Sequence, residues 1–312
     1  MGDDRTSVVI ITHHRREELL HTLDRLAELP EQPAVLLTDN AVDRGPGRAA
    51  ADRTGDAGSV AEAVARRHPG VRVLSPGANL GAVGRNLAAR YVTTPYLAFC
   101  DDDSWWAPGS LAGAADLLDA HPRVGAVTAR ILVEPGGHED PVVAELRESP
   151  VPAPPGLPGP ALGSFLAAAT VLRTDAFRTA GGFSPRLWLG GEEELLACDL
   201  LTAGWWLVHA GHLTVHHAPS ALRDSTGRRE DGIRNTLWTT WLRRPVGPAL
   251  RRSGHLLRTA PRDRTTTRAI GRALAGLPWL LRERRVVPPE VENLLRPLDR
   301  AQRASKARRY VG

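Results

Sequence analysis

The feature that most restricts the fold of this chain is a regular alternation of short apolar runs and amphipathic segments over its first 130 residues. Residues 8–11, 35–38 and 96–100 are β-branched or apolar runs of strand length. Between such runs, leucines such as Leu19 and Leu23 recur on one helical face. Strands that alternate with helices form a mainly parallel sheet with right-handed crossovers and helices on both faces. The sequence therefore predicts an α/β fold built on such a sheet.

The composition sets limits on the class of protein. The chain has 312 residues, of which 42% are hydrophobic, enough for a substantial core. Cys100 and Cys198 lie far apart in apolar segments, which indicates buried free thiols in a reducing compartment. The first residues do not match a signal peptide, and the longest apolar stretch, residues 161–172, is too short to span a bilayer. We therefore expect a cytoplasmic protein.

The basic residues are concentrated near the end of the chain. From Leu242 onward, 18 Arg and Lys stand against 5 Asp and Glu, a balance of +13. The net charge of the whole chain is only +5, so residues 1–241 carry a balance of −8. An acidic main body argues against nucleic acid as a partner. We predict a main α/β domain over residues 1–245 and an Arg-rich helical region over residues 246–312.

The Arg-rich region admits two interpretations. Apolar residues and arginines alternate at helical spacing over residues 265–281, and a second helix is expected at 289–309. These helices can pack on the main domain or form a homodimer contact, with their arginines in water. They can also lie on an anionic membrane surface. We favour packing, because arginine is abundant throughout the chain, and keep peripheral membrane contact as the alternative.

Polar residues follow several predicted strands at the point where each strand ends. Thr12, Asp39 and the triplet 101–103 come at or just after strand ends, and Asn79 follows the strand at 71–74. The carboxyl ends of parallel strands meet at one edge of a sheet, where ligands bind. We therefore expect these side chains to line one site.

The three consecutive aspartates, Asp101, Asp102 and Asp103, would repel one another without a nearby cation. At an extended strand end, Asp101 and Asp103 would share a face, and Asp102 would point toward backbone or solvent. Two carboxylates that face a substrate phosphate suit Mg²⁺ or Mn²⁺. The alternative is an acidic turn that caps the helix after Pro108.

A second acidic cluster lies in GGEEELL, residues 190–196. The helix dipole favours acidic side chains in a first turn, which by itself accounts for Glu192, Glu193 and Glu194. The preceding glycines and Trp188 indicate instead a close approach to a ligand, where a glutamate of raised pKa acts as a general base. The residues alone leave both interpretations open.

The histidines match no zinc signature. His209, His212, His216 and His217 lack the spacing of HExxH or Cys/His sites. One of them could complete a metal site formed by the aspartates, whereas for His209 and His212 we expect a strand edge with partly exposed rings.

The glycines of GANLGAVGRN, residues 77–86, form neither a dinucleotide fingerprint nor a P-loop. They do open a helix, and Arg85 near its first turn would suit a diphosphate.

In their order along the chain, these segments resemble glycosyltransferase family 2, a group of inverting, nucleotide-sugar-dependent enzymes with the GT-A fold. The resemblance covers residues 6–245. It rests on VVIITHHRREELLHTLDRL, VLLTDN, NLGAVGRNLAA, TPYLAFCDDD, GGFSPRLWLGGEEELLACDLLTAGWWL, VHHAPS and RNTLWTTWLRRP.

The resemblance implies a role for each matching residue. Asp103 would be the main ligand of a Mg²⁺ or Mn²⁺ ion that bridges two phosphates, with Asp101 and His217 beside it. Glu193 would deprotonate the acceptor hydroxyl; Glu192 is the nearest rival, because three glutamates stand where the family commonly has Glu-Asp. The residues implied to bind the nucleotide sugar are Thr12, Asp39, Asn79, Arg85, Asp101, Asp102 and Arg234.

The implied activity is metal-dependent, inverting transfer of a sugar from a nucleotide-diphosphate donor to a hydroxyl of a glycan, a lipid-linked molecule or a small molecule. A nucleotidyltransferase is one alternative, although HHRREE offers no Gly-rich phosphate loop near the N-terminus. The other is a non-catalytic adaptor that binds a nucleotide sugar or a membrane surface.

Overall fold

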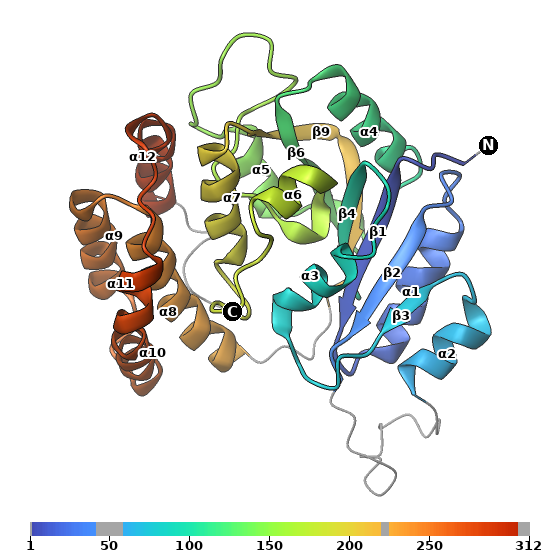
Figure 1. The fold of residues 1–312 in the computed structure, drawn as a ribbon, viewed down its shortest axis with the longest axis horizontal. Helices are drawn as coiled ribbons and strands as arrows, with labels where there is room; N and C mark the ends of the chain where they lie inside the picture. Colours follow the sequence, from blue (N-terminus) through green and yellow to red (C-terminus); the bar gives the residue numbers. More distant parts are fainter. Residues whose placement is uncertain (1, 42–58, 220–224, 305–312) are drawn as a thin grey trace, which may run out of the picture.

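The computed structural model shows a mixed β-sheet with helices on both faces (Figure 1). The structure describes residues 2–41, 59–219 and 225–304. In these residues the strand order is β3-β2-β1-β4-β8-β6-β9-β5, and β7 pairs with β6. The strands are β1 (Thr6–Thr12), β2 (Ala34–Asp39), β3 (Arg72–Leu74), β4 (Tyr96–Asp101), β5 (Ser104–Trp106), β6 (Val124–Val133), β7 (His138–Glu139), β8 (Thr170–Arg173) and β9 (Trp206–His217).

Helices cover both faces of this sheet and form a further layer beyond one edge (Figure 1). The first seven α-helices are α1 (Arg16–Ala27), α2 (Val60–Arg67), α3 (Gly84–Ala89), α4 (Ser110–Ala120), α5 (Pro141–Arg147), α6 (Thr174–Thr179) and α7 (Glu192–Thr202). The last five are α8 (Ser225–Arg243), α9 (Val246–Thr259), α10 (Arg264–Ala275), α11 (Leu277–Glu283) and α12 (Pro289–Ala304). Two short 3₁₀ helices are η1 (Gly81–Val83) and η2 (Ala167–Ala169).

The first half of the sheet is parallel, and the second half is mixed. Strand β1 lies between β2 and β4 and is parallel to both, and β2 is parallel to β3. Strand β8 is antiparallel to β4 and to β6, whereas β6 and β9 are parallel. The structure thus confirms the α/β prediction. Strand β8 escaped the sequence analysis because a short apolar run fits a buried helix as well as a strand.

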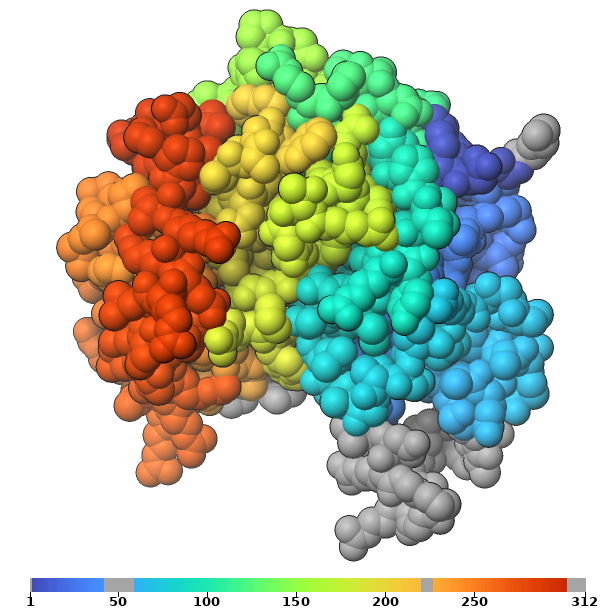
Figure 2. All heavy atoms as spheres, viewed as in Figure 1, coloured from blue at the N-terminus to red at the C-terminus, as the bar shows by residue number. Residues whose placement is uncertain are grey.

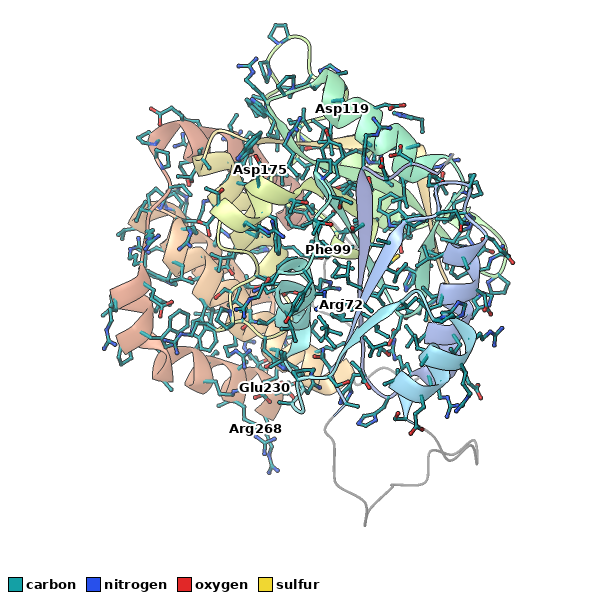
Figure 3. The ribbon with its side chains drawn as sticks, turned by 45° about the vertical axis from the view of Figure 1, so that its right-hand side comes forward. Arg72, Phe99, Asp119, Asp175, Glu230 and Arg268 are labelled. Carbon is teal, nitrogen blue, oxygen red and sulfur yellow. The ribbon has the colours of Figure 1, made fainter. Side chains whose placement is uncertain are left out.

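Strand side chains are buried on both faces because helices cover both. Val8 and Ile10 belong to one apolar cluster with Leu19 of α1, whereas Val9 belongs to the cluster on the other face. That second cluster contains Phe99, which lies in the middle of the molecule (Figure 3) and 5.3 Å, centroid to centroid, from Phe177. Because successive strand residues point to opposite faces, a strand buried on both sides reads as a continuous apolar run.

The Pro/Gly-rich segment at residues 151–160 is a loop that docks on the sheet. Val151 and Ala161 form an antiparallel bridge, and Ala161 bridges to Val208 of β9. The backbone N–H of Leu162 donates to the carbonyl oxygen of Leu207 at 2.8 Å. The loop is therefore part of the sheet domain. The Gly/Asp/Arg-rich stretch of the sequence that follows Asn40 and runs to Gly58 lies almost wholly outside the described residues.

The C-terminal helices pack onto the sheet domain through α7 and α8. Helix α8 contacts α7, α9, α10 and α11, and Val291 and Leu295 of α12 join the apolar cluster that includes Leu200 of α7. Buried Arg244 pairs with Glu292 at 2.7 Å across the predicted boundary at residue 245. The helix predicted at 265–281 is divided at Gly276, where α11 begins with Pro278 in its first turn. Among the described residues, no helix combines the length and the apolar character needed to cross a membrane.

Candidate active site

The chain reverses direction at the aspartate triplet. Strand β4 ends at Asp101, the backbone turns through Asp102 and Asp103, and β5 begins at Ser104. The Ser104 hydroxyl oxygen accepts a hydrogen bond from the Asp101 N–H at 2.9 Å, which fixes the turn. The expectation that Asp101 and Asp103 share a face of an extended strand is wrong, because the turn sends each aspartate toward different partners.

Asp102 and Asp103 share a cation that the sequence analysis missed. Arg15 Nη1 lies 3.1 Å from Asp102 Oδ1 and 3.1 Å from Asp103 Oδ2. The Thr12 hydroxyl donates to Asp102 Oδ2 at 2.8 Å. Burial nevertheless raises the pKa of Asp102 to about 6, and the Arg15 charge and the Thr12 bond oppose that rise. Arg15 is therefore the protein's own cation at this turn, placed by the end of β1.

Asp103 and His217 meet because β5 and β9 pair in a specific register. Ser104 lies opposite His217 in this antiparallel pair, and the Ala218 N–H donates to the Asp103 carbonyl oxygen at 2.8 Å. His217 Nε2 lies 3.6 Å from Oδ1 of Asp103, whose side chain is almost fully buried. A carboxylate oxygen and an imidazole nitrogen at this separation can bind one divalent cation.

The donor set at this point fits a metal that takes further ligands from substrate. Among the residues that the structure describes, no three His, Cys, Asp or Glu side chains gather closely enough to hold a metal ion. Mg²⁺ and Mn²⁺ sites on enzymes commonly use one or two carboxylates and complete their coordination with phosphate oxygens and water. Asp103 and His217 match that arrangement.

The other histidines of the cluster lie elsewhere. His209 is buried, with Nδ1 3.0 Å from the carbonyl oxygen of Thr128, so the expectation of a partly exposed ring is wrong for it. His212 is exposed, as expected. His216 Nδ1 lies 2.8 Å from Glu134 Oε1, and its ring stacks on Trp105.

Asp101 points away from Asp103 and toward α3. It pairs with Arg85, which is 4% exposed and lies over the rings of Phe99 and Phe183. The charges of Glu192 and Glu193 are also close enough to act on Arg85. Asp101 and Arg85 therefore connect the aspartate turn to the start of α7.

The three glutamates at the start of α7 have three different environments. Glu192 is 4% exposed, and its Oε2 has no hydrogen-bond partner among the described residues. Glu193 Oε1 accepts a hydrogen bond from the Ala167 N–H at 2.5 Å. Glu194 Oε1 lies 2.7 Å from Arg252 Nη2 of α9, an ion pair that joins α7 to the C-terminal helices.

Burial raises the pKa of Glu192 and of Glu193. For Glu193 the negative charge of Glu192 adds to the rise, while the Ala167 N–H and the Arg85 charge oppose it. A carboxylate that holds a proton more strongly than usual is suited to accept one from a hydroxyl group. The helix start thus supplies two candidate bases and one structural glutamate.

The loop before α7 is held from two sides. Asn235 Nδ2 donates to the carbonyl oxygens of Leu187, Leu189 and Gly190, at 2.7, 2.9 and 2.6 Å. Arg234 Nη2 donates to the Leu187 carbonyl oxygen at 3.2 Å, and Arg234 Nη1 lies 2.7 Å from Asp231. Both residues belong to α8, so the predicted diphosphate contact Arg234 is seen to support the loop that carries the glutamates.

On its other side the same loop contacts η1 and Asn79, which come just before α3. The Trp188 carbonyl oxygen accepts from the Ala82 N–H at 2.7 Å, and Trp188 Nε1 donates to the Asn79 carbonyl oxygen at 3.2 Å. Trp188 has φ of 62°, and a Cβ on Gly81 would collide with its backbone. Asn79 is therefore brought next to the glutamate loop, and its Oδ1 accepts from the Gly81 N–H at 2.9 Å.

Asp39 lies beside Thr12 at the ends of two paired strands. The two residues are direct neighbours in the β1–β2 register, and Asp39 Oδ1 accepts from the Ala41 N–H at 3.0 Å. The structure thus brings Thr12, Asp39 and the aspartate turn to one edge of the sheet, as predicted from the strand ends.

Comparison with known proteins indicates an enzyme class for this chain. Residues 7–157 match the family model described as Glycosyl transferase family 2. This chain is therefore similar to that family over just under half of its length. It is also 26% identical over 259 residues to an N-acetylglucosaminyl-diphospho-decaprenol L-rhamnosyltransferase of Mycobacterium tuberculosis, a match that covers 72% of this chain and 78% of the relative. The predicted enzyme class, glycosyltransferase, is confirmed.

Solved structures of glycosyltransferases share the fold. The mannosyltransferase PcManGT from Pyrobaculum calidifontis, solved with GDP-Man and Mn²⁺, is 20% identical with a TM-score of 0.57, over 91% of this chain and 73% of the other. S. aureus TarS 1-349 with UDP-GlcNAc is 14% identical with a TM-score of 0.60, over 98% of this chain and 89% of the other. These similarities confirm the GT-A fold.

Proposed function

We propose that the protein transfers a sugar, with inversion, from a nucleotide-diphosphate donor to an acceptor hydroxyl, assisted by Mg²⁺ or Mn²⁺. The observation that carries the proposal is the division of the sheet edge into two chemically different ends. Asp103 and His217 offer metal ligands at one end, and Glu192 and Glu193 offer bases of raised pKa at the other. Asp101 and Arg85 lie between them.

At the donor end, Thr12 and Asp39 are placed to contact the nucleoside, as neighbours at the ends of β1 and β2. Asp103 and His217 would hold the cation; Asp101, the further ligand that the resemblance implies, pairs with Arg85 and would have to leave it to reach the ion. A bound divalent cation would neutralise negative charge on the departing diphosphate. Complexes of related folds with GDP-Man and Mn²⁺ or with UDP-GlcNAc support this choice of donor class.

Arg15 gives the donor end a second source of positive charge. Its guanidinium already lies within 3.1 Å of Asp102 and Asp103. When a nucleotide diphosphate enters, Arg15 is available as a cationic partner for phosphate oxygens as well as for the two carboxylates. Asp102 in turn positions Arg15 and Thr12.

At the acceptor end, Glu193 is proposed as the general base, with Glu192 as its rival. The base removes the proton of the acceptor hydroxyl. The hydroxyl oxygen attacks the anomeric carbon from the face opposite the diphosphate, which leaves with the electrons of the broken C–O bond. A single displacement of this kind inverts the anomeric configuration. The Ala167 N–H holds Glu193, and the positive charge of Arg85 offsets part of the negative charge of Asp101, Glu192 and Glu193.

Asn79, Arg85 and Arg234 are proposed to act mainly as positioning residues. Arg234 and Asn79 support the 187–190 loop from opposite sides, and Arg85 pairs with Asp101. The acceptor is a hydroxyl-bearing molecule; the printed name of the mycobacterial relative supports a lipid-linked sugar diphosphate as the first class to test.

A donor panel tests the proposed function. Purified protein is incubated with UDP-, GDP- and dTDP-sugars, with Mg²⁺, Mn²⁺ or a chelator, and diphosphate release is measured. We expect release from one nucleotide class, lost with the chelator and in Asp103→Asn. Asp116→Asn, at an exposed position on α4, is the matched control. Absence of binding and turnover for every donor with every metal would reject the proposal.

A further inference from the structure

The exposed apolar side chains of this protein are concentrated on the C-terminal helices. Among the described residues nine large apolar side chains are exposed, and seven of them lie between positions 246 and 286. Leu281 is 70% exposed, Leu274 59% and Leu250 58%. Because large apolar side chains gathered on one part of a surface mark interaction sites, this distribution calls for a partner.

These side chains share helix faces. Val246, Leu250 and Leu257 are spaced by four and seven residues, so they lie on one side of α9, while Ala249 and Leu256 on another side are buried. In the next segment Leu277 and Leu281 are four residues apart on α11. Helices α9, α10 and α11 all pack on α8 and form the outer layer at the left edge of the molecule (Figures 1 and 2).

Arginines surround the exposed leucines, and they carry uncompensated charge. Seven exposed arginines of this layer form no ion pair with any described residue. They are Arg251, Arg258, Arg262, Arg264, Arg268, Arg282 and Arg285. Two acidic residues lie between positions 246 and 286, and both are already paired: Asp263 with Arg229, and Glu283 with Arg186. Arg268 projects away from the body of the protein (Figure 3).

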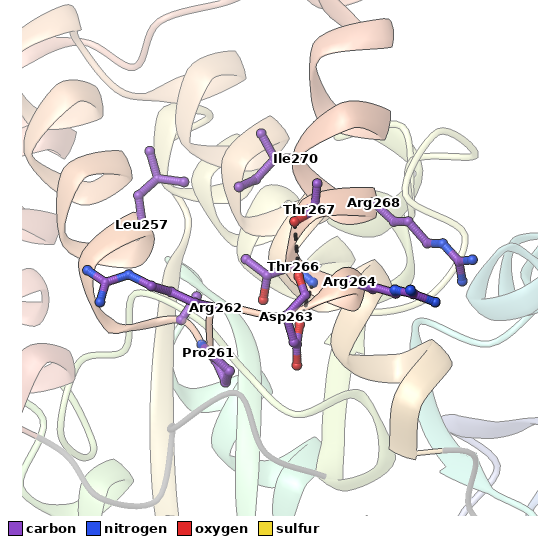
Figure 4. A pocket seen from close by; sticks show the side chains of 10 residues that line it. Leu257, Pro261, Arg262, Asp263, Arg264, Thr266, Thr267, Arg268 and Ile270 are labelled. Atoms are coloured by element: carbon purple, nitrogen blue, oxygen red, sulfur yellow. Dashed lines mark hydrogen bonds between the residues drawn. The ribbon is translucent and has the colours of Figure 1, made fainter.

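A hollow lies within this layer, between the end of α9 and the start of α10 (Figure 4). It has a volume of about 640 Å³ and combines apolar walls, including Leu257 and Ile270, with arginines 262, 264 and 268. The Thr266 hydroxyl in its lining is buried and has no hydrogen-bond partner among the described residues. An amphiphile with an anionic head group matches this combination of surfaces.

We propose that α9, α10 and α11 dock the protein on the surface of an anionic phospholipid bilayer. Leucines would enter the boundary between head groups and acyl chains, and the surrounding arginines would pair with lipid phosphates. A nucleic acid would leave the leucines without an apolar partner. A symmetric second copy would place the same uncompensated arginines opposite each other. The inference concerns attachment and holds whether or not the proposed reaction is correct.

Vesicle co-sedimentation of the full chain tests the inference. The probes are vesicles of phosphatidylcholine with phosphatidylglycerol, and vesicles of phosphatidylcholine alone, each at low and at high ionic strength. We expect binding to the anionic vesicles at low ionic strength and release at high ionic strength. Each arginine near an anionic membrane raises the partition coefficient of the protein onto the vesicles about fivefold. The triple variant Arg258→Gln, Arg268→Gln and Arg282→Gln should therefore lower this coefficient by about a hundredfold.

The matched control removes the same charge elsewhere. Arg66→Gln with Arg90→Gln and Arg123→Gln changes three exposed arginines outside this layer and should leave vesicle binding nearly unchanged. A second variant keeps the charge and removes apolar contact: Leu274→Ser with Leu277→Ser and Leu281→Ser should reduce binding at least tenfold. Circular dichroism melting confirms that each variant folds.

Three outcomes would overturn the inference. The first is no binding to anionic vesicles at low ionic strength. The second is an equal loss of vesicle binding in the two arginine variants, because binding would then depend on the net charge of the protein and not on the position of the arginines. The third is a dimer in sedimentation velocity that the leucine variant dissociates while vesicle binding is unchanged, because the face would then bind a second copy.

Discussion

The sheet domain and the C-terminal helical layer differ in how much of their apolar side chains they bury. On β1, Val8, Val9 and Ile10 are all fully buried, because helices cover both faces of the sheet. On α11, Leu280 is 3% exposed and its neighbour Leu281 is 70% exposed. The sheet domain directs polar side chains to one edge, where the proposed chemistry lies. The helical layer keeps apolar and basic side chains on its outside, as expected of a docking surface. The two proposals thus place the reaction and the membrane contact in separate regions.

The largest expected effect concerns the acidic helix start in the sheet domain. Glu193→Gln should lower kcat/KM by about 10²–10⁴-fold, the usual contribution of a general base. Glu194→Gln, which alters the Arg252 ion pair, should lower it by far less. Both are measured by diphosphate release at saturating metal. If Glu192→Gln is inactive and Glu193→Gln is active, the base is Glu192 and the assignment moves by one residue.

The next effect compares two adjacent residues of the helical layer. Leu280→Ala should lower the free energy of unfolding by about 2–5 kcal/mol, because it leaves a cavity in the cluster with Leu187 and Leu242. Leu281→Ala should change it by less than about 0.5 kcal/mol, as at most exposed positions. Urea titration measures both. Equal losses would show that Leu281 is covered in solution.

The next prediction concerns Asn235 of α8, which holds the 187–190 loop before α7. Its loss should have a smaller effect on stability than the loss of Leu280. Asn235→Ala removes one amide donor from three carbonyl oxygens of the 187–190 loop, of which that of Leu187 keeps its bond from Arg234, at a cost of about 1–3 kcal/mol. We expect a lower Tm and a lower kcat together. Asn293→Ala, at an exposed position on α12, should change neither. An unchanged kcat in Asn235→Ala would argue against a positioning role for this loop.

The smallest effect is a pH dependence. Burial raises the pKa of Glu192 and Glu193 above the ordinary glutamate value of 4.5. The folded protein therefore retains protons that the unfolded chain releases, so stability falls as the pH rises from about that value through the raised pKa. Over the same range kcat/KM should rise as the base ionises. Melting curves against pH for the native chain and Glu193→Gln test this, and the variant should lose part of the slope.

The parallel half of the fold could be predicted because its physical causes are local. Residues 8–11 and 96–100 are apolar runs of strand length that alternate with amphipathic segments, a pattern typical of a sheet covered on both faces. The convergence of Thr12 and Asp39 followed from strand ends alone. Helix α9 lies inside the region predicted to be helical, but its bounds, Val246–Thr259, were not predicted.

The parts of the site that escaped prediction depend on contacts distant in sequence. The pairing of Arg15 with Asp102 and Asp103 requires the end of β1 to lie beside the β4–β5 turn. The approach of His217 to Asp103 depends on the β5–β9 register. The support of the glutamate loop by Asn235 requires α8 to pack on α7. The only sequence signal for Arg15 was a basic residue just after a strand end.

The most direct test of the account is metal-dependent binding of a nucleoside diphosphate at Asp103. Calorimetric titration of UDP and GDP, with Mn²⁺ and with a chelator, compares the native chain with Asp103→Asn. The account predicts binding of one nucleotide by the native chain only with Mn²⁺, and loss of that binding in Asp103→Asn. Binding that persists with the chelator and in the variant would contradict the assignment of the metal site to Asp103 and His217.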